Sequence, residues 1–164
     1  MRRACPYRGE NRGPGKDVHG VLDSQPGIRE QPGSMSDSDP SSTFSYVTEQ
    51  LDKRRIAYLH VVEPRIKGTE LIAAGQEPVA ARDLRPKFSR ALIVAGGFTK
   101  SSAEAIIETG LADFVAFGRH FIANPDLRER FRRGLPLNRY DRSTFYGGDA
   151  RGYIDYPAHA RARA

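Results

Sequence analysis

Three short, mainly apolar runs, each followed by a segment of helical spacing, constrain the fold more than any other feature of this sequence. The runs lie near residues 56–62, 91–95 and 113–117, and polar residues, glycine or proline bound each of them. Strands that are apolar along their whole length belong to parallel sheets covered on both faces. Strands that alternate with helices indicate the same architecture. The sequence therefore predicts an α/β protein with three parallel strands.

The predicted helices carry start and stop signals. A polar side chain that precedes a helix can accept from its free N–H groups, and proline fits the first helical position. A glycine after the last turn provides a left-handed stop. The expected starts are Asp39-Pro40, a capping box of Ser101 and Glu104, and Asn124-Pro125; the expected stops are Gly110 and Gly134. The polar stretch 67–76 is expected to be a loop, and Pro86 to end a short helix.

The first 33 residues differ from the rest of the chain. Ten of them are glycine or proline, and their apolar residues follow neither a strand nor a helix period. Such a composition is typical of irregular or disordered segments. We therefore expect an irregular arm over residues 1–33 and a single domain over residues 34–164.

Composition argues against several classes of protein. No apolar run is long enough to span a bilayer, and the basic start lacks the apolar segment of a signal peptide. The net charge is +6, but basic and acidic residues are mixed, as on a solvated helix face, so neither a nucleic-acid nor a membrane partner is expected. Cys5 is the only cysteine, which excludes an internal disulfide. The expected setting is reducing and cytoplasmic.

Two successive predicted strands end in glycine, and this pattern indicates a binding site. The second strand runs into Gly96-Gly97, and the third into Gly118-Arg119. In parallel α/β folds ligands bind beyond the carboxyl ends of the strands. Glycines let backbone N–H groups approach an anion, and an arginine adds donors shaped for phosphate. The alternative is that these glycines only turn the chain and that Arg119 is a surface charge. Two such motifs at successive strand ends make this alternative less favourable than a binding site.

Four stretches carry a closer resemblance: "AYLHVVEPR", "LIVAGGFT", "FVAFGRHFIANPDL" and "LPLNRYDRSTFYGGDARGYIDYP". Together they resemble the carboxyl-terminal part of the old yellow enzyme family, the FMN-dependent ene-reductases, over about Ser34 to Pro157. The resemblance implies a (β/α)8 TIM barrel with FMN at its mouth, of which this chain holds about the last three β/α units. It also implies that NADH or NADPH reduces the flavin. The flavin then reduces the C=C bond of an α,β-unsaturated carbonyl, a small enone or enal.

The resemblance assigns cofactor roles to individual residues. Gly96 and Gly97 match the phosphate-binding pair after the seventh strand of the family, and Gly118 and Arg119 match the pair after the eighth. Phe98 is then expected near the flavin ring. The third predicted strand would end where it does in order to hold the phosphate of FMN.

Other assignments come from the edges of the matched region. Tyr146 matches an aromatic residue that lines the substrate-binding mouth, although a tyrosine that merely packs in the tail is the alternative. Arg29 is a candidate for a flavin-contacting arginine of the fifth strand, but the residues after it differ from the family pattern. Glu63 and Arg65 are interpreted as a structural ion pair at the end of the sixth strand.

Several functional residues of the family have no match in this sequence. They are the carbonyl-gripping pair and the proton-donating tyrosine of the fourth strand, and the flavin contacts of the first and third strands. No catalytic residue or metal ligand is therefore assigned, and Cys5 lies in an unmatched segment. We expect a truncated ene-reductase that needs a complementary barrel fragment for activity. A non-catalytic degenerate fragment and a different phosphate-binding barrel enzyme remain as alternatives.

Overall fold

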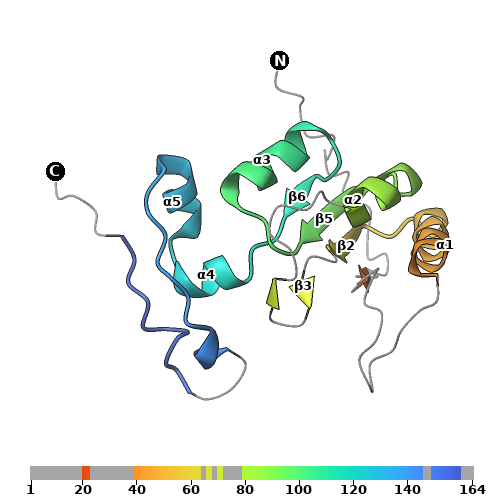
Figure 1. Ribbon diagram of the computed structural model, residues 1–164. Coiled ribbons are helices and arrows are strands. Elements are labelled where there is room, and N and C mark those ends of the chain that lie inside the picture. Colours follow the sequence, from red (N-terminus) through yellow and green to blue (C-terminus); the bar gives the residue numbers. More distant parts are fainter. Residues whose placement is uncertain are drawn as a thin grey trace, which may run out of the picture.

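The computed structural model describes residues 20–22, 39–63, 66–67, 70–71, 79–145 and 149–159, and it shows the predicted alternation of strands and helices (Figure 1). The strands are β1 (Gly20–Leu22), β2 (Tyr58–Val62), β3 (Ile66–Lys67), β4 (Glu70–Leu71), β5 (Ala91–Ala95) and β6 (Phe114–Val115). The α-helices are α1 (Pro40–Lys53), α2 (Val79–Leu84), α3 (Lys100–Glu108), α4 (Arg119–Ala123) and α5 (Leu127–Arg133). Short 3₁₀ helices, η1 (Arg85–Lys87) and η2 (Arg142–Thr144), complete the described structure.

The main sheet is parallel throughout, as the sequence predicted. Its strand order is β1-β2-β5-β6, so the three predicted strands are neighbours in chain order. Leu59 lies opposite Leu92 between β2 and β5, and Val94 lies opposite Val115 between β5 and β6. All carboxyl ends of these strands therefore lie at one edge of the sheet.

One face of the sheet forms the core. Alternate residues of β2 and β5 are buried, and they pack in one cluster with Leu84, Phe88 and Ile106 from the helical layer. The buried strand residues are Leu59, Val61, Leu92 and Val94. Their neighbours on the other face are only half-buried, although several of them, such as Ile93, are apolar. Both faces of the sheet thus carry apolar residues, and the described helices cover only the face that holds Leu59, Val61, Leu92 and Val94.

The first helix begins as its sequence predicts, whereas the predicted capping box of the third helix is wrong. The Asp39 carboxylate accepts from the backbone N–H of Ser42 at 3.1 Å, and Pro40 opens α1. In α3 the N-cap is Thr99, which forms a reciprocal capping box with Ser102. The helix starts earlier than predicted because Thr99, two residues after Gly97, already has an extended backbone and accepts from the N–H of Ser102.

The prediction of Asn124 as an N-cap is also wrong. The chain turns helical immediately after Gly118, so Asn124 ends the unpredicted helix α4 as its C-cap. Asp126 then precedes α5, which ends as predicted at Gly134 with a positive φ of 67°. Gly110 follows α3 with a positive φ of 74°, again as predicted.

Two further differences from the sequence-based expectations concern short strands. The stretch 67–76 was expected to be a loop, but β3 and β4 form an antiparallel pair there, with Ile66 opposite Leu71. The arm contributes β1, which extends the parallel sheet beyond β2. A three-residue strand has too little periodicity to be recognised in sequence. The rest of residues 1–33 lie outside the described residues, so their irregularity stays a prediction.

Candidate phosphate site at the strand ends

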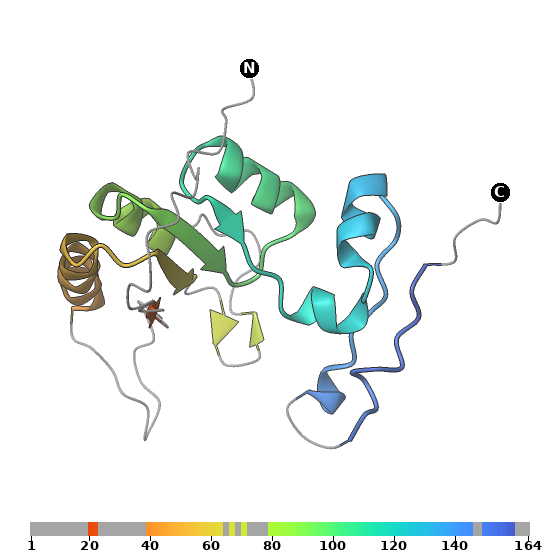
Figure 2. The ribbon, with the colours of Figure 1, turned by 180° about the vertical axis from the view of Figure 1, so that it is seen from behind.

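The predicted glycine motifs follow two neighbouring parallel strands and therefore share one edge of the sheet. Gly96 and Gly97 follow β5 directly, and Gly118 lies three residues beyond the end of β6. Both ribbon views show α4 and the β3–β4 hairpin beyond this carboxyl edge, away from α1 and α3 (Figures 1 and 2). The structure thus brings together the two motifs that the sequence predicted to form one site.

Gly96 also has a purely structural reason to be glycine. Its φ is +104°, and a Cβ at this position would lie 3.0 Å from the carbonyl oxygen of Glu63 at the end of β2. Any larger side chain would push apart two neighbouring strand ends in a strained backbone conformation. Gly97 has a φ of 69°, so the backbone also turns there in a way that favours glycine.

Glu63 fixes this strand end to the helical layer. Its side chain is completely buried, and its two carboxylate oxygens accept from the backbone N–H groups of Ala80 and Ala81 at 3.1 and 2.9 Å. A carboxylate at the start of a helix satisfies donors that have no partner inside the helix. The predicted partner Arg65 lies outside the described residues, so the ion pair with Glu63 stays a prediction.

Gly118 differs from Gly96 and Gly97 because its backbone conformation does not require glycine. Its φ is −79°, and it is the N-cap of α4. A Cβ at this position would meet no atom within 4 Å, so the space beside the backbone is open. The N–H groups of Phe121 and Ile122 already donate to the carbonyl oxygen of Gly118, at 3.0 and 3.1 Å. Those of Arg119 and His120, at the start of the helix, have no acceptor within it and are candidate donors to an anion.

Arg119 is half-buried and lies against the carboxyl-terminal tail. Its guanidinium is 5.5 Å from the ring centre of Tyr140, and Nη1 donates a long hydrogen bond of 3.5 Å to the tyrosine hydroxyl. Within the part of the chain that the structure describes, no carboxylate forms an ion pair with Arg119. A half-buried guanidinium that no carboxylate of the described residues neutralises is suited to bind an anion from solution.

The positive charge of Arg119 affects the pKa of the neighbouring residue, His120. Partial burial is the main cause that lowers the pKa of His120 below its usual value, and the positive charge of Arg119 lowers it further. His120 packs at 6.0 Å from the ring of Tyr140 and at 6.4 Å from that of Phe117. We therefore interpret His120 as a neutral packing residue beside the site.

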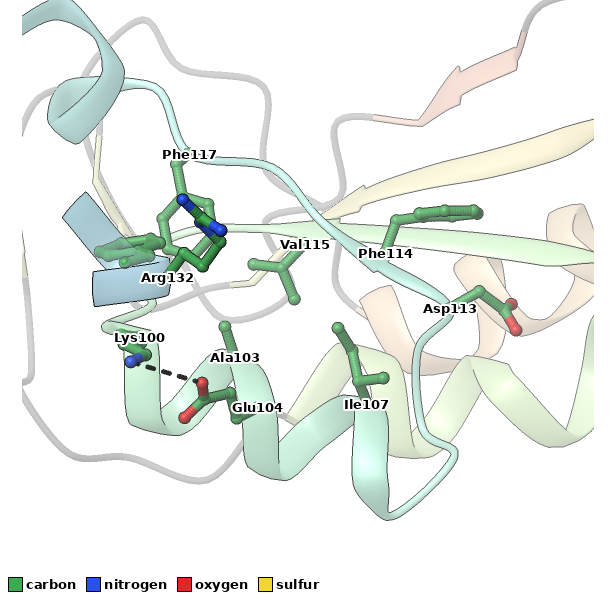
Figure 3. Close-up of a pocket in the computed structure, with 10 residues that line it drawn as sticks. Lys100, Ala103, Glu104, Ile107, Asp113, Phe114, Val115, Phe117 and Arg132 are labelled. Atoms are coloured by element: carbon green, nitrogen blue, oxygen red, sulfur yellow. Dashed lines mark ion pairs between the residues drawn. The ribbon is translucent and has the colours of Figure 1, made fainter. Parts of the chain in front are cut away.

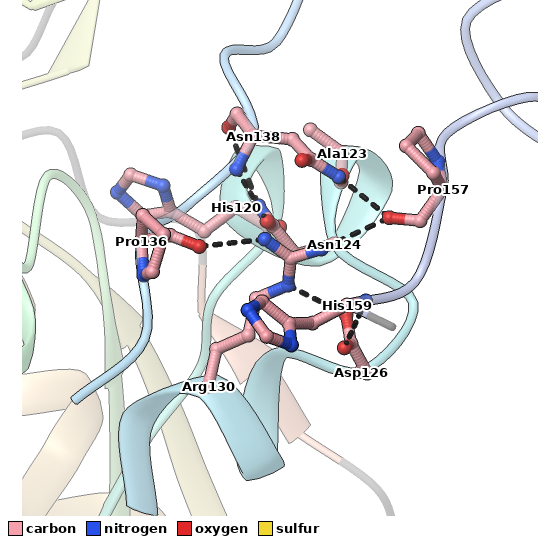
Figure 4. A network of polar contacts seen from close by, with 9 residues as sticks. All are labelled: His120, Ala123, Asn124, Asp126, Arg130, Pro136, Asn138, Pro157 and His159. Atoms are coloured by element: carbon pink, nitrogen blue, oxygen red, sulfur yellow. Dashed lines mark hydrogen bonds and ion pairs between the residues drawn. The ribbon is translucent and has the colours of Figure 1, made fainter. Parts of the chain in front are cut away.

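A network of polar contacts holds the tail against α4 and α5 (Figure 4). The Arg130 side chain is only 4% exposed and lies at its centre. It donates to the Asp126 carboxylate at 2.7 Å and to the carbonyl oxygens of Pro136 and Pro157 at 2.6 and 2.9 Å. The hydrogen bond from Arg130 is the main cause that lowers the pKa of Asp126, and the N–H of His159 lowers it further.

Two buried or half-buried asparagines complete this network. Asn124 donates from Nδ2 to the carbonyl oxygen of His120 and accepts from the backbone N–H of Asn138 at 2.7 Å. Asn138 donates in turn from its side chain to the carbonyl oxygens of Ala123 and Pro157, both at 2.8 Å. The sequence did not predict these tail anchors. Only the Asp126–Arg130 pair carried a recognisable signal, the helical i,i+4 spacing of opposite charges.

The remaining predicted site residues are placed as follows. Phe98 is only 4% exposed and belongs to the hydrophobic core, where it supports the end of β5. A contact between its side chain and the flavin stays a prediction. Arg29 and Tyr146 lie outside the described residues, and their predicted roles in cofactor and substrate binding stay predictions as well.

An apolar groove lies on the open side of β6, between α3 and α5 (Figure 3). Ile107, Phe114, Val115 and Phe117 contribute to its lining. Phe114 is 53% exposed although it belongs to a strand of the main sheet. Within the described chain β6 has a single neighbour, β5, so its other edge is free to pair. The groove lies between the sheet and its helices, and together with the free edge of β6 it marks where a closed barrel would continue.

The parallel strands and their flanking helices together define a portion of a parallel α/β barrel. The model of the NADH:flavin oxidoreductase / NADH oxidase family matches residues 30–138, about two thirds of the chain. The chain belongs to this family, which includes the old yellow enzymes. The match begins within the arm, four residues before the expected domain boundary.

Curated relatives agree with this assignment. The chain is 47% identical over 126 residues to 12-oxophytodienoate reductase 1 of Oryza sativa subsp. japonica, and 43% identical over 123 residues to 12-oxophytodienoate reductase 2 of Arabidopsis thaliana. Each alignment covers 74% of this chain and 32% of the relative. The chain thus spans about a third of the length of the curated relatives it matches.

Solved structures show the same partial coverage. Morphinone reductase superimposes with a TM-score of 0.65 at 43% identity, over 76% of this chain and 32% of that protein. A structure of morphinone reductase in complex with tetrahydroNAD gives a TM-score of 0.64 at 42% identity, with the same coverage. The fold is therefore a partial (β/α)8 TIM barrel, as the sequence predicted. FMN and a nicotinamide nucleotide are the cofactors of this family.

The residues at the strand ends fit the phosphate of FMN. Gly97 and Gly118 leave backbone donors uncovered by side chains, and the space beside Gly118 is open. Arg119 adds a guanidinium that no described carboxylate neutralises. A dianionic phosphate needs this combination of N–H donors and positive charge.

No helix in the described part of the chain is both long and apolar enough to cross a membrane.

Proposed function

We propose that this chain is the FMN-phosphate-binding part of an NAD(P)H-dependent ene-reductase. The observation that supports it is the shared edge of β5 and β6, which joins Gly96-Gly97 to Gly118-Arg119 in a member of a flavin oxidoreductase family. Backbone N–H groups from both strand ends would bind the phosphate oxygens, and Arg119 would neutralise their charge. Flavin bound there would supply hydride chemistry to the C=C bond of a small enone or enal.

The proposal extends to the remaining assigned residues. Arg29 and Phe98 are proposed to contact the flavin, and Tyr146 to line the substrate-binding mouth. These roles come from the resemblance of the sequence motifs. A cytoplasmic setting is proposed on the same basis as before, the single cysteine and the absence of an expected disulfide.

Catalysis is proposed to require further barrel strands. The groove beside β6 and the half-buried second face of the sheet support this, because a closed barrel covers both. The chain alone is then a truncated and catalytically inactive form that a complementary barrel fragment completes. We expect enone reduction by NAD(P)H only when the amino-terminal part of a related reductase is mixed with it. Equal activity of the chain without that part would contradict this step.

The phosphate site is tested by comparing FMN with riboflavin, which lacks the phosphate. Titrations of the full chain, followed by quenching of flavin fluorescence, should show tighter binding of FMN than of riboflavin. Charge-assisted hydrogen bonds contribute roughly 1.5–3 kcal/mol, so Arg119→Ala should weaken FMN binding about 10- to 100-fold. Riboflavin binding should be unchanged. Arg119→Lys should restore part of the affinity, because it keeps the charge without the planar fork.

The matched control is Arg128→Ala, which removes an exposed arginine of α5 and the same net charge. It should leave both flavin affinities within about twofold, since exposed charges are screened by salt. Equal affinity of the unmodified chain for FMN and riboflavin would refute the phosphate site. An Arg119→Ala variant with full preference for FMN would remove this arginine from it.

A further inference from the structure

Tyr140 has a contact that the flavin-binding motifs do not explain. It lies in the tail segment "PLNRYDR", yet its ring packs against the guanidinium of Arg119, 5.5 Å from the ring centre. The long 3.5 Å hydrogen bond engages only one of the five N–H donors of Arg119. The guanidinium thus lies over the ring of Tyr140 and donates to its hydroxyl through one nitrogen.

The position of Tyr140 is fixed from both sides along the chain. Two residues before it, Asn138 is hydrogen-bonded to Asn124 and to the carbonyl oxygen of Ala123. One residue after it, the backbone N–H of Asp141 donates to the hydroxyl of Tyr156 at 2.8 Å.

The rings on either side leave Tyr140 little freedom to rotate. That of His120 lies 6.0 Å away in an edge-on arrangement, and that of Phe145 lies 5.7 Å away. Tyr140 is therefore a rigid support for the longer and more flexible arginine side chain.

We propose that Tyr140 is a positioning residue that holds the Arg119 side chain ready to bind a phosphate group. This inference rests on the proposed function, because the phosphate is that of FMN. An arginine loses rotamer freedom when it binds a ligand, and an aromatic support that restricts it beforehand reduces this loss. The interaction of a guanidinium with the π face of a ring leaves the N–H edge available for a planar, bidentate contact.

The proposal makes a specific prediction for the two flavins. Tyr140→Leu should weaken FMN binding by about three- to tenfold, the range expected for loss of a partly buried cation–π contact. Riboflavin binding should stay unchanged, because Tyr140 acts through an arginine that only the phosphate engages. Tyr140→Phe keeps the ring and should bind FMN within about twofold of the unmodified chain.

A double-mutant cycle separates positioning from a general structural effect. In the Arg119→Ala background, Tyr140→Leu should cause no further loss of FMN affinity, because the residue through which it acts is absent. Additive losses would overturn the proposal, since Tyr140 would then act independently of Arg119. Equal losses for FMN and riboflavin would overturn it too.

A measurement without flavin tests the geometry itself. In NMR spectra of the full chain, the Arg119 side-chain protons should be shifted upfield by the ring of Tyr140. Tyr140→Leu should abolish this shift, and Tyr140→Phe should preserve it. An unshifted Arg119 in the unmodified chain would overturn the inference, whereas the phosphate site would still be judged by Arg119→Ala. Conversely, a shifted arginine with no effect of Arg119→Ala on FMN binding would overturn the role of Tyr140, because Arg119 would then not bind the phosphate. The proposed function itself would be refuted by equal affinity of the unmodified chain for FMN and riboflavin.

Discussion

Replacing Arg130 with methionine should detach the carboxyl-terminal tail from α4 and α5. Methionine keeps the unbranched stem of the side chain but removes the guanidinium that reaches Asp126 and two tail carbonyls at 2.6–2.9 Å. Because Arg130 is almost completely buried, solvent screens these contacts little. The perturbation therefore removes one positive charge and one donor from each of the three acceptors. Asp126 keeps the N–H of His159, and the Pro157 oxygen keeps the side chain of Asn138.

The magnitude follows from the exposure of the groups that remain. Breaking a fully buried ion pair costs about 3–5 kcal/mol, mainly because the remaining charge stays buried. The Asp126 side chain is 21% exposed, so water can partly replace the lost donor. We therefore expect a loss of about 2–4 kcal/mol for Arg130→Met. Arg132→Met removes an ion pair to Glu129 of similar length from a side chain that is 70% exposed, and should cost far less stability because solvent screens the pair.

Urea unfolding gives the total effect, and hydrogen exchange locates it. In Arg130→Met the amide of His159, which donates to Asp126, should exchange faster, whereas amides of β5 should keep their protection. The folded pKa of Asp126 is lowered, so its contribution to stability is present above the ordinary value of 3.8 and is lost as the pH falls below it. Arg130→Met should lack this part of the acid dependence. Equal losses of stability in Arg130→Met and Arg132→Met would refute the reasoning.

Two other predictions test the residues around the strand ends. Gly96→Ala should lower the free energy of unfolding in urea by about 2–4 kcal/mol, because the strained backbone and the contact with Glu63 act together. Gly110→Ala introduces only the backbone strain, so it should lower the free energy of unfolding by about 1–2 kcal/mol. Equal losses would exclude the contact with Glu63 as a cause. In an NMR titration His120 should have a pKa below its ordinary 6.5, and Arg119→Ala should raise it. Because the folded pKa is lowered, the stability that neutral His120 contributes should be lost as the pH falls below 6.5, and a pKa unaffected by Arg119→Ala would contradict the proposed repulsion.

The strands and the meeting of their glycine ends at one edge of the sheet were predictable because each depended on a local pattern. The runs that became β2, β5 and β6 are apolar on both faces, which only a doubly covered parallel strand requires. Gly96 and Gly118 follow two of these strands, and parallel pairing alone was enough to bring them to one edge. The extra strand β1 could not be predicted, since three residues carry no measurable period.

Errors arose where two elements compete for the same residues. Asn124 precedes a proline as an N-cap should, but the earlier helix α4 reaches it first and uses its side chain at a C-terminus. The tail was not predictable because its order depends on contacts with residues distant in sequence. Asn138 and Pro157 have no periodicity of their own, and they are fixed by Asn124 and Arg130.

The guanidinium of Arg130 also sets how the tail can change during evolution. It binds the carbonyl oxygens of Pro136 and Pro157, so it closes the base of the loop between them, and the side chain of Asn138 adds a second bond to Pro157. The free-energy cost of closing a flexible loop grows only logarithmically with length, by about 0.6 kcal/mol for each doubling. Both anchors are backbone oxygens, which any residue supplies. Insertions and substitutions between Arg142 and Asp155, beyond the contacts of Asn138, Tyr140 and Tyr156, can therefore accumulate without loosening this attachment.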